Sequence, residues 1–399
     1  MWPEMIRNIE IQEAARAWGL RPDIVEKDYV LGWLLMGLSA HPRLQTQWIF
    51  KGGTALKKCY VETYRFSEDL DFTLTPGASQ NLDEIVSWLS AICATLSNET
   101  GIEFPPAQIE LRAHPNPRGG ITLRGKVGYR GPLQPRTAPK LKLDLTTDEI
   151  IVRPPILRTI HHPYSDHPTN PAHLHCYPIE EILAEKTRAM SERGLPRDLY
   201  DIIRLFRREG FRLDPAAVQD VLAQKCAHRG LPIPTLAILE ASPNRAELES
   251  EWANMLGHQL PALPPLESLW AELGDYFDWL EGKPLAELPP VEEAEASDAE
   301  WRQPDYISLS AEWGVTTPIE AIRFAGANRL RIQLHYLAAQ GQRGIREVEP
   351  YSFRRSRAGH LLFYGRNIEH SQISAYRFDR IADVKVTNHP FLPHWRVEF

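Results

Sequence analysis

The segment Lys51–Leu74 (KGGTALKKCYVETYRFSEDLDFTL) constrains the fold of this chain more than any other. A short apolar strand, Trp48–Phe50, leads into it, and two glycines follow Lys51 directly. Two glycines let the backbone approach a ligand closely, and the N-terminus of the next helix, expected from Ala55 to about Thr63, offers free N–H groups. The segment therefore predicts a turn that binds a triphosphate.

The residues that follow predict a strand that carries two acids. Asp69 and Asp71 are two positions apart in DLDFTL, so both side chains project from one face. Adjacent carboxylates repel each other, a cost that is usually met by a hard cation such as Mg²⁺ or Mn²⁺.

A third acid lies further along the chain. In Lys140–Thr146 (KLKLDLT) the leucines alternate with Lys140, Lys142 and Asp144. If this strand pairs beside Asp69 and Asp71, Asp144 completes a cluster of three carboxylates, enough to hold two metal ions. A glycine pair with D-x-D alone is also typical of a loop and a solvated strand edge. The ordered set of strand, Gly-Gly, helix and two acidic strands is more specific, and it predicts a nucleotidyltransferase site.

Several segments carry a family resemblance. They are VEKDYV, FKGGTAL, RFSEDLDF and IEEILAEKTRAMSERGLPRDLYDIIRL, which begin at Val25, Phe50, Arg65 and Ile179. Over roughly residues 5–280 the chain resembles the AbiEii-type nucleotidyltransferase toxins, including the mycobacterial MenT group, within the polymerase-beta-like nucleotidyltransferase superfamily. The charges of Glu26, Lys27 and Asp28 have two interpretations, an exposed surface or a brace beneath the site.

The resemblance implies roles for individual residues. The catalytic set would be Asp69, Asp71, Asp144, Lys186 and Asp198, of which the first three would bind metal. The nucleotide-binding set would be Gly52, Gly53, Thr54, Arg65, Ser67, Lys186, Arg197 and Asp201, with Lys57 as a secondary candidate. Without the resemblance, Lys186 and Arg197 are typical of a solvated helix face and Asp198 of a helix N-cap. Arg65 is either a phosphate contact or a partner for Glu68.

The resemblance also implies an activity. The enzyme would transfer NMP from an NTP to a tRNA 3′ end, as a toxin with a separately encoded antitoxin, in a toxin–antitoxin or phage-defence system. Two alternatives stay open at this point. The acceptor could be a protein hydroxyl, or the chain could be a non-catalytic regulator that senses nucleotide or RNA.

The C-terminal part predicts short strands separated by turns, at 329–337, 345–350, 360–364, 375–378 and 384–387. About residues 321–391 resemble a WYL domain, a small Sm-like β-fold, although the Trp-Tyr-Leu tripeptide is absent. The arginines expected to bind RNA or another ligand, three of them in a predicted turn, are Arg354, Arg355, Arg357, Arg377 and Arg380. Solvated turn arginines and a structural Asp379–Arg380 pair are the alternative. No helix-turn-helix pattern is evident.

The fold class predicted is therefore α+β, a polymerase-beta-like domain with a mixed sheet and a helical cap, followed by a small β-rich WYL-like domain. We expect a nucleotidyltransferase domain at 1–212, a helical cap at 213–284, an acidic Pro-rich linker at 285–303 and the β domain at 304–399. The net charge of −7 is uneven, with −5 in the linker and +4 after it. It argues against nucleic-acid binding through bulk charge but leaves room for a basic face.

The remaining signals are negative or weak. The four cysteines are widely spaced and predict reduced thiols. The histidines of the Pro-rich segment 161–176 (HHPYSDHPTNPAHLHC) could ligate zinc, but a loop near an acceptor nucleic acid is the favoured interpretation. The longest apolar run, Tyr29–Ala40, is too short to cross a bilayer and no signal peptide is evident. We therefore expect a cytoplasmic protein without a membrane partner.

Overall fold

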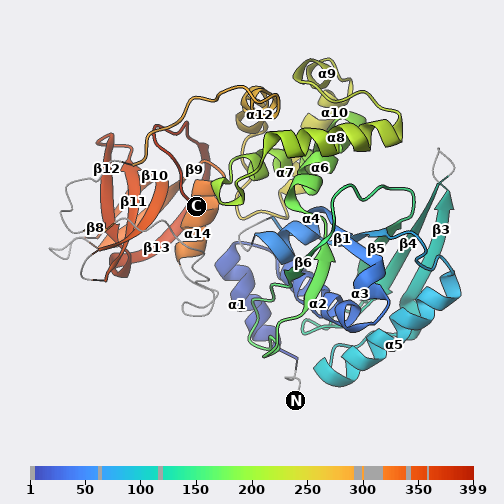
Figure 1. The fold of residues 1–399 in the computed structure, drawn as a ribbon. Helices are drawn as coiled ribbons and strands as arrows, with labels where there is room; N and C mark the ends of the chain where they lie inside the picture. Colours follow the sequence, from blue (N-terminus) through green and yellow to red (C-terminus); the bar gives the residue numbers. More distant parts are fainter. Residues whose placement is uncertain are drawn as a thin grey trace. The chain divides into compact units, whose positions relative to one another are not determined.

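The computed structural model describes residues 5–61, 65–115, 120–291, 299–300, 318–337, 343–356 and 359–399. The chain forms two compact units. The first comprises Met1–Arg188 with Asp220–Ile233, and the second comprises Ala189–Gln219 with Pro234–Phe399 (Figure 1). The four domain ranges predicted from the sequence divide the chain differently and stay a prediction.

The first unit is built on a seven-stranded mixed sheet with the order β3-β4-β5-β2-β1-β7-β6. The strands are β1 (Trp48–Lys51), β2 (Asp69–Leu74), β3 (Ile109–Pro115), β4 (Ile121–Gly128), β5 (Lys140–Thr146), β6 (Ile156–Thr159) and β7 (His173–Cys176). β2 pairs with β5, which is the condition stated above for Asp144 to join the other two acids. This pair and the pair of β1 with β7 are parallel, whereas the other neighbours are antiparallel. The α+β class is confirmed.

Along the chain, five α-helices of this unit come before the first strand or between the first strands of the sheet. They are α1 (Asn8–Trp18), α2 (Pro22–Ala40), α3 (Leu44–Gln47), α4 (Gly52–Ala55) and α5 (Leu82–Thr100). α2 is apolar on nearly every side and is almost wholly buried, with α1 and α5 packed against it. α5 also packs on β3, so one face of the sheet is covered there (Figure 1). The helix predicted at Ala55–Thr63 is instead α4 followed by a π-helical turn, Leu56–Tyr60, and Thr63 lies outside the described residues.

The charged residues of α2 form a brace under the glycine turn. Asp28 is buried and accepts a hydrogen bond from Lys58 Nζ at 2.6 Å and another from the Tyr164 hydroxyl at 3.0 Å. Lys27 pairs with Glu68, the residue directly before β2. Of the two interpretations of these charges, the structure supports the brace.

A second ionic cluster is buried between α6 (Ile179–Arg193) and the part of α8 (Pro215–Arg229) that belongs to the first unit. Lys225 is fully buried, with its Nζ 3.0 Å from Glu181, 3.4 Å from Glu185 and 3.6 Å from Glu149. The ammonium group also donates to the Ile150 carbonyl at 2.9 Å. One buried lysine thus connects acids from two parts of the chain.

The second unit combines short helices with an antiparallel sheet of order β12-β11-β10-β9-β13, to which β8 is added by pairing with β10. The helices are α7 (Pro196–Phe206), a 3₁₀ turn (Glu209–Phe211), α9 (Leu236–Glu240), α10 (Asn244–Leu256), α11 (Leu266–Trp270), α12 (Leu273–Leu280) and α14 (Pro318–Ala327). The strands are β8 (Ala299–Glu300), β9 (Leu330–Leu337), β10 (Arg343–Ser356), β11 (Leu361–Asn367), β12 (Gln372–Arg377) and β13 (Ile381–Pro390), and a 3₁₀ turn (Phe378–Arg380) joins the last two.

Parts of the predicted linker belong to this sheet. Val291 is buried in the β-domain core with Tyr351, Leu362 and Phe391, and β8 pairs with Arg355 and Ser356 of β10. These positions are therefore not a solvated spacer, because an apolar side chain and backbone hydrogen bonds fix them to the sheet.

The C-terminal sheet is tied to α7 within the same unit. The Tyr200 hydroxyl donates to Asn328 Oδ1 at 2.9 Å, and Arg204 Nη1 donates to the Ala327 carbonyl at 2.8 Å. Both bonds are buried at the C-terminus of α14, where a cation beside the terminal carbonyl groups of a helix is favourable. These bonds help to hold α7 in place, and α7 is the helix that carries three of the predicted site residues.

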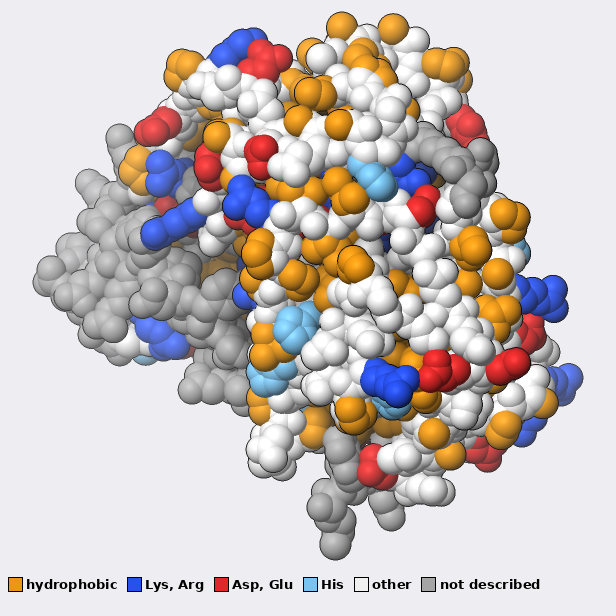
Figure 2. Space-filling model, turned by 45° about the vertical axis from the view of Figure 1, so that its right-hand side comes forward, with side chains coloured by type: hydrophobic (Ala, Val, Ile, Leu, Met, Phe, Trp, Pro, Cys, Tyr) orange, Lys and Arg blue, Asp and Glu red, His pale blue; other side chains and the backbone are white. Residues whose placement is uncertain are grey.

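Figure 2 shows basic, acidic and apolar side chains interspersed on one face of the molecule, so the negative net charge is not gathered there in one patch. Among the described residues, no helix is both long enough and apolar enough to cross a membrane.

We expect Lys225→Met to lower the free energy of unfolding by about 3–5 kcal/mol, because the change leaves three carboxylates without their shared buried cation. Lys283→Met is the matched control, since Lys283 makes exposed ion pairs with Asp278 and Glu281 and its loss should change the stability little. Urea denaturation followed by circular dichroism measures both. Equal effects in the two variants would contradict a structural role for the buried cluster.

Candidate active site

The turn between β1 and α4 can be formed only by glycine. Gly52 has φ +77°, and a Cβ there would lie 2.5 Å from Asp71 Oδ2. A Cβ at Gly53 would lie 2.4 Å from Arg65 Nη2 and 3.0 Å from Ser67 Oγ. The backbone therefore passes directly against an acid on one side and a buried arginine on the other.

The register of three strands sets the acids in a row. Lys51 of β1 lies opposite Asp71 of β2, and Asp71 lies opposite Asp144 of β5, so the three side chains share one face of the sheet. Asp69 Oδ1 lies 3.4 Å from Lys142 Nζ, and Asp144 Oδ1 lies 3.9 Å from Arg124 Nε. The predicted juxtaposition of Asp144 with the D-x-D pair is thus present.

The electrostatics of this row favour a cation. Burial raises the pKa of Asp71 to about 6, with Asp69 and Asp144 adding to the rise and Lys51 and Lys186 opposing it. Burial also raises the pKa of Asp144, against the effect of Arg124. Carboxylate oxygens are the ligands that Mg²⁺ and Mn²⁺ prefer, so the donor set fits such an ion by its chemistry. As the side chains stand, however, the described part of the chain contains no cluster of three or more His, Cys, Asp or Glu arranged to hold a metal.

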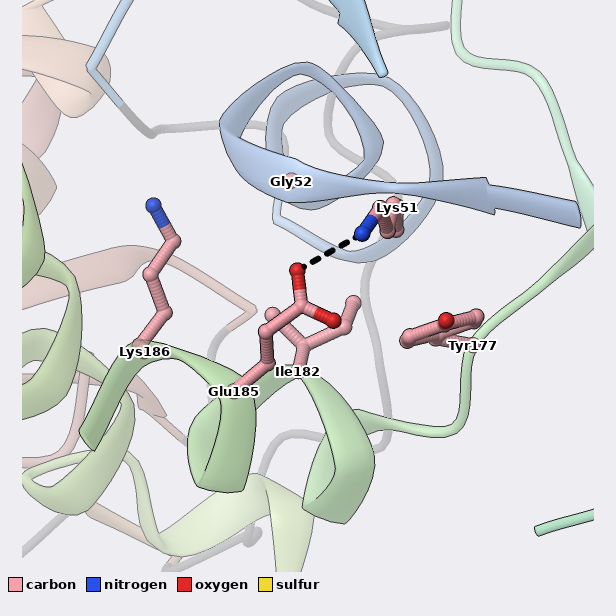
Figure 3. A pocket seen from close by; sticks show the side chains of 6 residues that line it. All are labelled: Lys51, Gly52, Tyr177, Ile182, Glu185 and Lys186. Atoms are coloured by element: carbon pink, nitrogen blue, oxygen red, sulfur yellow. Dashed lines mark hydrogen bonds and ion pairs between the residues drawn. The ribbon is translucent and has the colours of Figure 1, made fainter. Parts of the chain in front are cut away.

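A small pocket opens beside the glycine turn, lined by Lys51, Gly52, Tyr177, Ile182, Glu185 and Lys186 (Figure 3). Glu185 and Lys186 project from α6 toward Gly52, and Glu185 Oε1 accepts from Lys51 Nζ at 2.9 Å. Burial opposes ionisation of Glu185, but Lys51 and Lys225 hold its pKa well below the ordinary value. Lys186 thus lines the pocket beside the glycine turn, and its predicted role in neutralising a triphosphate stays a prediction.

Glu185 and Tyr177 are site residues that the sequence analysis missed. The ammonium groups of Lys51 and Lys225 lie 5.6 Å and 4.6 Å from the centre of the Tyr177 ring, on which both make cation–π contacts. Glu185 directly precedes Lys186 in the predicted helix, and this adjacency was the one available signal.

The other predicted residues near the turn are buried. Thr54 donates its hydroxyl to the Asp69 carbonyl, so its side chain ties α4 to β2. Arg65 and Ser67 stand behind Gly53, and Arg65 also donates to the Phe66 carbonyl at 3.4 Å. Lys57 lies 4.6 Å from the centre of the Phe66 ring. Their parts in nucleotide binding stay predictions.

Arg197, Asp198 and Asp201 lie on α7, in the second unit. The carboxylate of Asp198 is fully buried and accepts two hydrogen bonds from Arg193, at 2.9 Å from Nε and 3.2 Å from Nη2. Leu195, not Asp198, is the N-cap of α7. The predicted catalytic role of Asp198 and the nucleotide-binding roles of Arg197 and Asp201 stay predictions.

The C-terminal arginines differ from the expectation. Arg354 and Arg355 lie in β10, not in a turn, and Arg354 is buried, 3.7 Å from Glu398 and with its guanidinium 5.0 Å from the centre of the Tyr364 ring. Arg377 pairs with Asp379, whereas the sequence analysis paired that acid with Arg380. Arg380 is half-buried, and Arg357 lies outside the described residues. RNA binding by this set stays a prediction, and the burial of Arg354 favours a structural role for that residue.

The histidine-rich segment is not one long loop. His173 and His175 lie in β7, and β6 precedes the segment as the edge strand of the sheet. His162 is buried against Tyr29 and Trp33 and lies 3.3 Å from Asp166 Oδ1. These contacts give His162 a place in the protein core.

The fold and the row of acids define a nucleotidyltransferase. A family model described as nucleotidyl transferase AbiEii toxin, type IV toxin–antitoxin system, matches residues 33–282, and the chain belongs to this family. A WYL domain model matches residues 319–386. Comparison with curated proteins gives no match.

The solved structures that match the chain include the following two. MenT4, a nucleotidyltransferase toxin from Mycobacterium tuberculosis H37Rv, is 18% identical with a TM-score of 0.49, and the match covers 81% of this chain and 98% of that one. The proteasome accessory factor B/C (PafBC) of Arthrobacter aurescens is 11% identical with a TM-score of 0.18, over 94% of this chain and 73% of that one.

We expect Asp71→Asn to raise the free energy of unfolding at pH 8 in buffer containing EDTA. Because the pKa of Asp71 is higher in the folded state than in the unfolded state, the wild type loses stability as the pH rises from about 4 to about 6. The full loss is about 3 kcal/mol, and the uncharged amide of the variant does not suffer it. Thermal or urea denaturation at pH 4 and pH 8 measures the difference, which should nearly vanish at the lower pH. Asp83→Asn, at an exposed acid of α5, is the control. A variant of Asp71 that is less stable than the wild type at pH 8 would contradict the electrostatics described.

Proposed function

We propose that this protein transfers a nucleoside monophosphate from an NTP to the 3′ end of an RNA, with tRNA as the leading candidate acceptor, as the toxin of a type IV toxin–antitoxin pair with a separately encoded antitoxin. The observation that carries the proposal is the row formed by Asp71 and Asp144 across β2 and β5, next to a glycine turn and Lys186. Membership of the AbiEii family supports the reaction class and the toxin–antitoxin setting.

The residues divide the chemistry among them. The N–H groups at Gly53 and Thr54 bind phosphate at the helix N-terminus, and the ammonium of Lys186 balances charge on the leaving group. When bound by Asp69, Asp71 and Asp144, Mg²⁺ or Mn²⁺ supplies Lewis-acid polarisation of the α-phosphate. Lys51 is held by Glu185 beside Asp71, where its charge offsets that of the acids.

The transfer step is an in-line displacement. The oxygen of the acceptor 3′-hydroxyl forms a bond to the α-phosphorus, and the bond from that phosphorus to the oxygen that bridges to the β-phosphate breaks. Pyrophosphate leaves with the bridging oxygen. The hydroxyl proton passes to Asp144, whose carboxylate lies opposite Asp71 on the paired strand and whose pKa is raised by burial.

The test is a labelling assay. The purified protein is incubated with Mg²⁺, each α-labelled NTP in turn, and either total tRNA or cell lysate, with Asp71→Asn beside it. We expect label in RNA with the wild type and at least a 100-fold lower rate with the variant, because the central carboxylate is lost. Label in protein would identify a protein hydroxyl as the acceptor. Absence of label with the wild type would favour a sensor that only binds.

Metal dependence has its own test. We expect EDTA to abolish labelling and added Mg²⁺ or Mn²⁺ to restore it, since three neighbouring carboxylates need a cation before an anionic triphosphate can approach them. The rate of labelling is measured against the concentration of free metal. Full activity in EDTA, after dialysis, would contradict the proposed role of the acids.

A further inference from the structure

The sheet of the first unit has an exposed charged surface next to the row of acids. β3, β4 and β5 alternate between buried apolar residues and outward polar ones. We call the outward side the charged face. Its residues are Glu110, Arg112, His114, Thr122, Arg124, Lys126, Lys140, Lys142, Asp144 and Thr146.

The charged face has more basic than acidic groups, and three of the basic ones are more exposed than either acid. The side chains of Arg112, Lys142 and Arg124 are 77%, 65% and 62% exposed, against 39% for Glu110 and 40% for Asp144. Glu110 is already shared, with Lys140 Nζ at 2.9 Å and Arg112 Nη2 at 4.0 Å. The surface therefore offers a positive charge in excess of its own ion pairs.

This face is continuous with the site. One cross-strand row runs from Asp71 through Asp144 and Arg124 to Arg112, each opposite the next. Neighbouring strands lie about 4.8 Å apart, so the row extends about 14 Å from Asp71. One strand of duplex DNA carries a phosphate per ~3.4 Å of its axis, and on that scale several phosphates of a nucleic-acid strand can lie over the face.

The composition of the face indicates which kind of partner fits. Protein interfaces are built on apolar and aromatic anchors and are poor in lysine. Within the described parts of these strands, the charged face has no large apolar side chain, since exposed Ile121 belongs to the alternate, core-facing set of β4. Lysine and arginine without Phe, Tyr or Trp beside them suit contacts to a phosphate backbone better than stacking on bases.

We propose that the charged face of β3, β4 and β5 holds the RNA acceptor by its phosphates, so that its 3′ end lies over Asp71 and Asp144. This deepens the proposed function, on which it rests, by naming the surface that binds the acceptor. Binding there is independent of RNA sequence and depends strongly on salt, because each phosphate contact releases condensed cations.

The test measures RNA binding without NTP. The full-length wild type is titrated into 5′-fluorescein-labelled tRNA over a series of KCl concentrations, and fluorescence anisotropy gives the Kd. The variant Arg112→Gln/Lys126→Gln removes two charges of the face that do not contact the acids of the site. The matched control Arg7→Gln/Arg16→Gln removes two exposed arginines at α1 and changes the net charge equally.

We expect the face variant to bind RNA roughly tenfold more weakly and to lower the slope of log Kd against log salt by about 1 to 2, while the control stays near the wild type. Circular dichroism of each variant verifies folding. Face and control variants that bind alike would overturn the inference, even if the wild type labels RNA as proposed.

If antitoxin neutralisation changed instead of RNA binding, the face would belong to a protein partner. In the labelling assay, a wild type that binds tRNA but labels only protein would overturn the proposed function, whatever the face variant does.

Discussion

The position of β2 between β1 and β5 is the constraint on which the rest of the site depends. Its antiparallel register with β1 sets Lys51 against Asp71, and its parallel register with β5 sets Asp71 against Asp144. A slip of one residue in either ladder would turn the acids of one strand into the core. The buried leucines of Lys140–Thr146 and the buried Leu70 and Phe72 prevent such a slip, since it would expose them to water. The apolar residues of these strands thus fix the chemistry of their polar neighbours.

Behind this row, buried charges reach the glycine turn in two steps. Lys225 lies among Glu149, Glu181 and Glu185, and Glu185 in turn accepts from Lys51. Burying so many charges is expensive, and well-packed apolar side chains would often be at least as stable. What the ionic arrangement adds is a fixed position for the ammonium group of Lys51. Lys51 stays ionised and directed toward α6, close to Asp71, while α8 is fastened to the same acids. The cluster is therefore better explained as a device that orients Lys51 than as a source of stability.

Local pattern was enough to predict the elements of the site, and long-range pairing decided what was missed. The alternation in Asp69–Leu74 and Lys140–Thr146 predicted both acidic strands, and the glycine pair predicted the turn. β6 and β7 were missed because each is only four residues long and pairs across the histidine-rich segment. Arg354 was expected in a turn because its core position depends on Glu398 and the carbonyl of Val291, which are distant in sequence, and on Tyr364 of the paired strand β11. Glu185 could not be separated from its exposed helical neighbours without knowing where Lys51 and Lys225 lie.

The net charge shows why composition is a poor guide to the partner of a protein like this one. The net charge of −7 counts every acid of the chain. An acid repels a polyanion such as RNA only where its charge faces that polyanion. Glu149 and Glu181 are buried against Lys225, and Asp28 is buried against Lys58, so none of these three presents its charge to solvent. On β3, β4 and β5, by contrast, the side chains of Arg112, Arg124 and Lys142 are 77%, 62% and 65% exposed. Because salt limits the reach of a charge to about 10 Å, an RNA strand on that surface would sense its local excess of cations, not the total for the chain. A chain with net negative charge can therefore still present a basic surface to a nucleic acid.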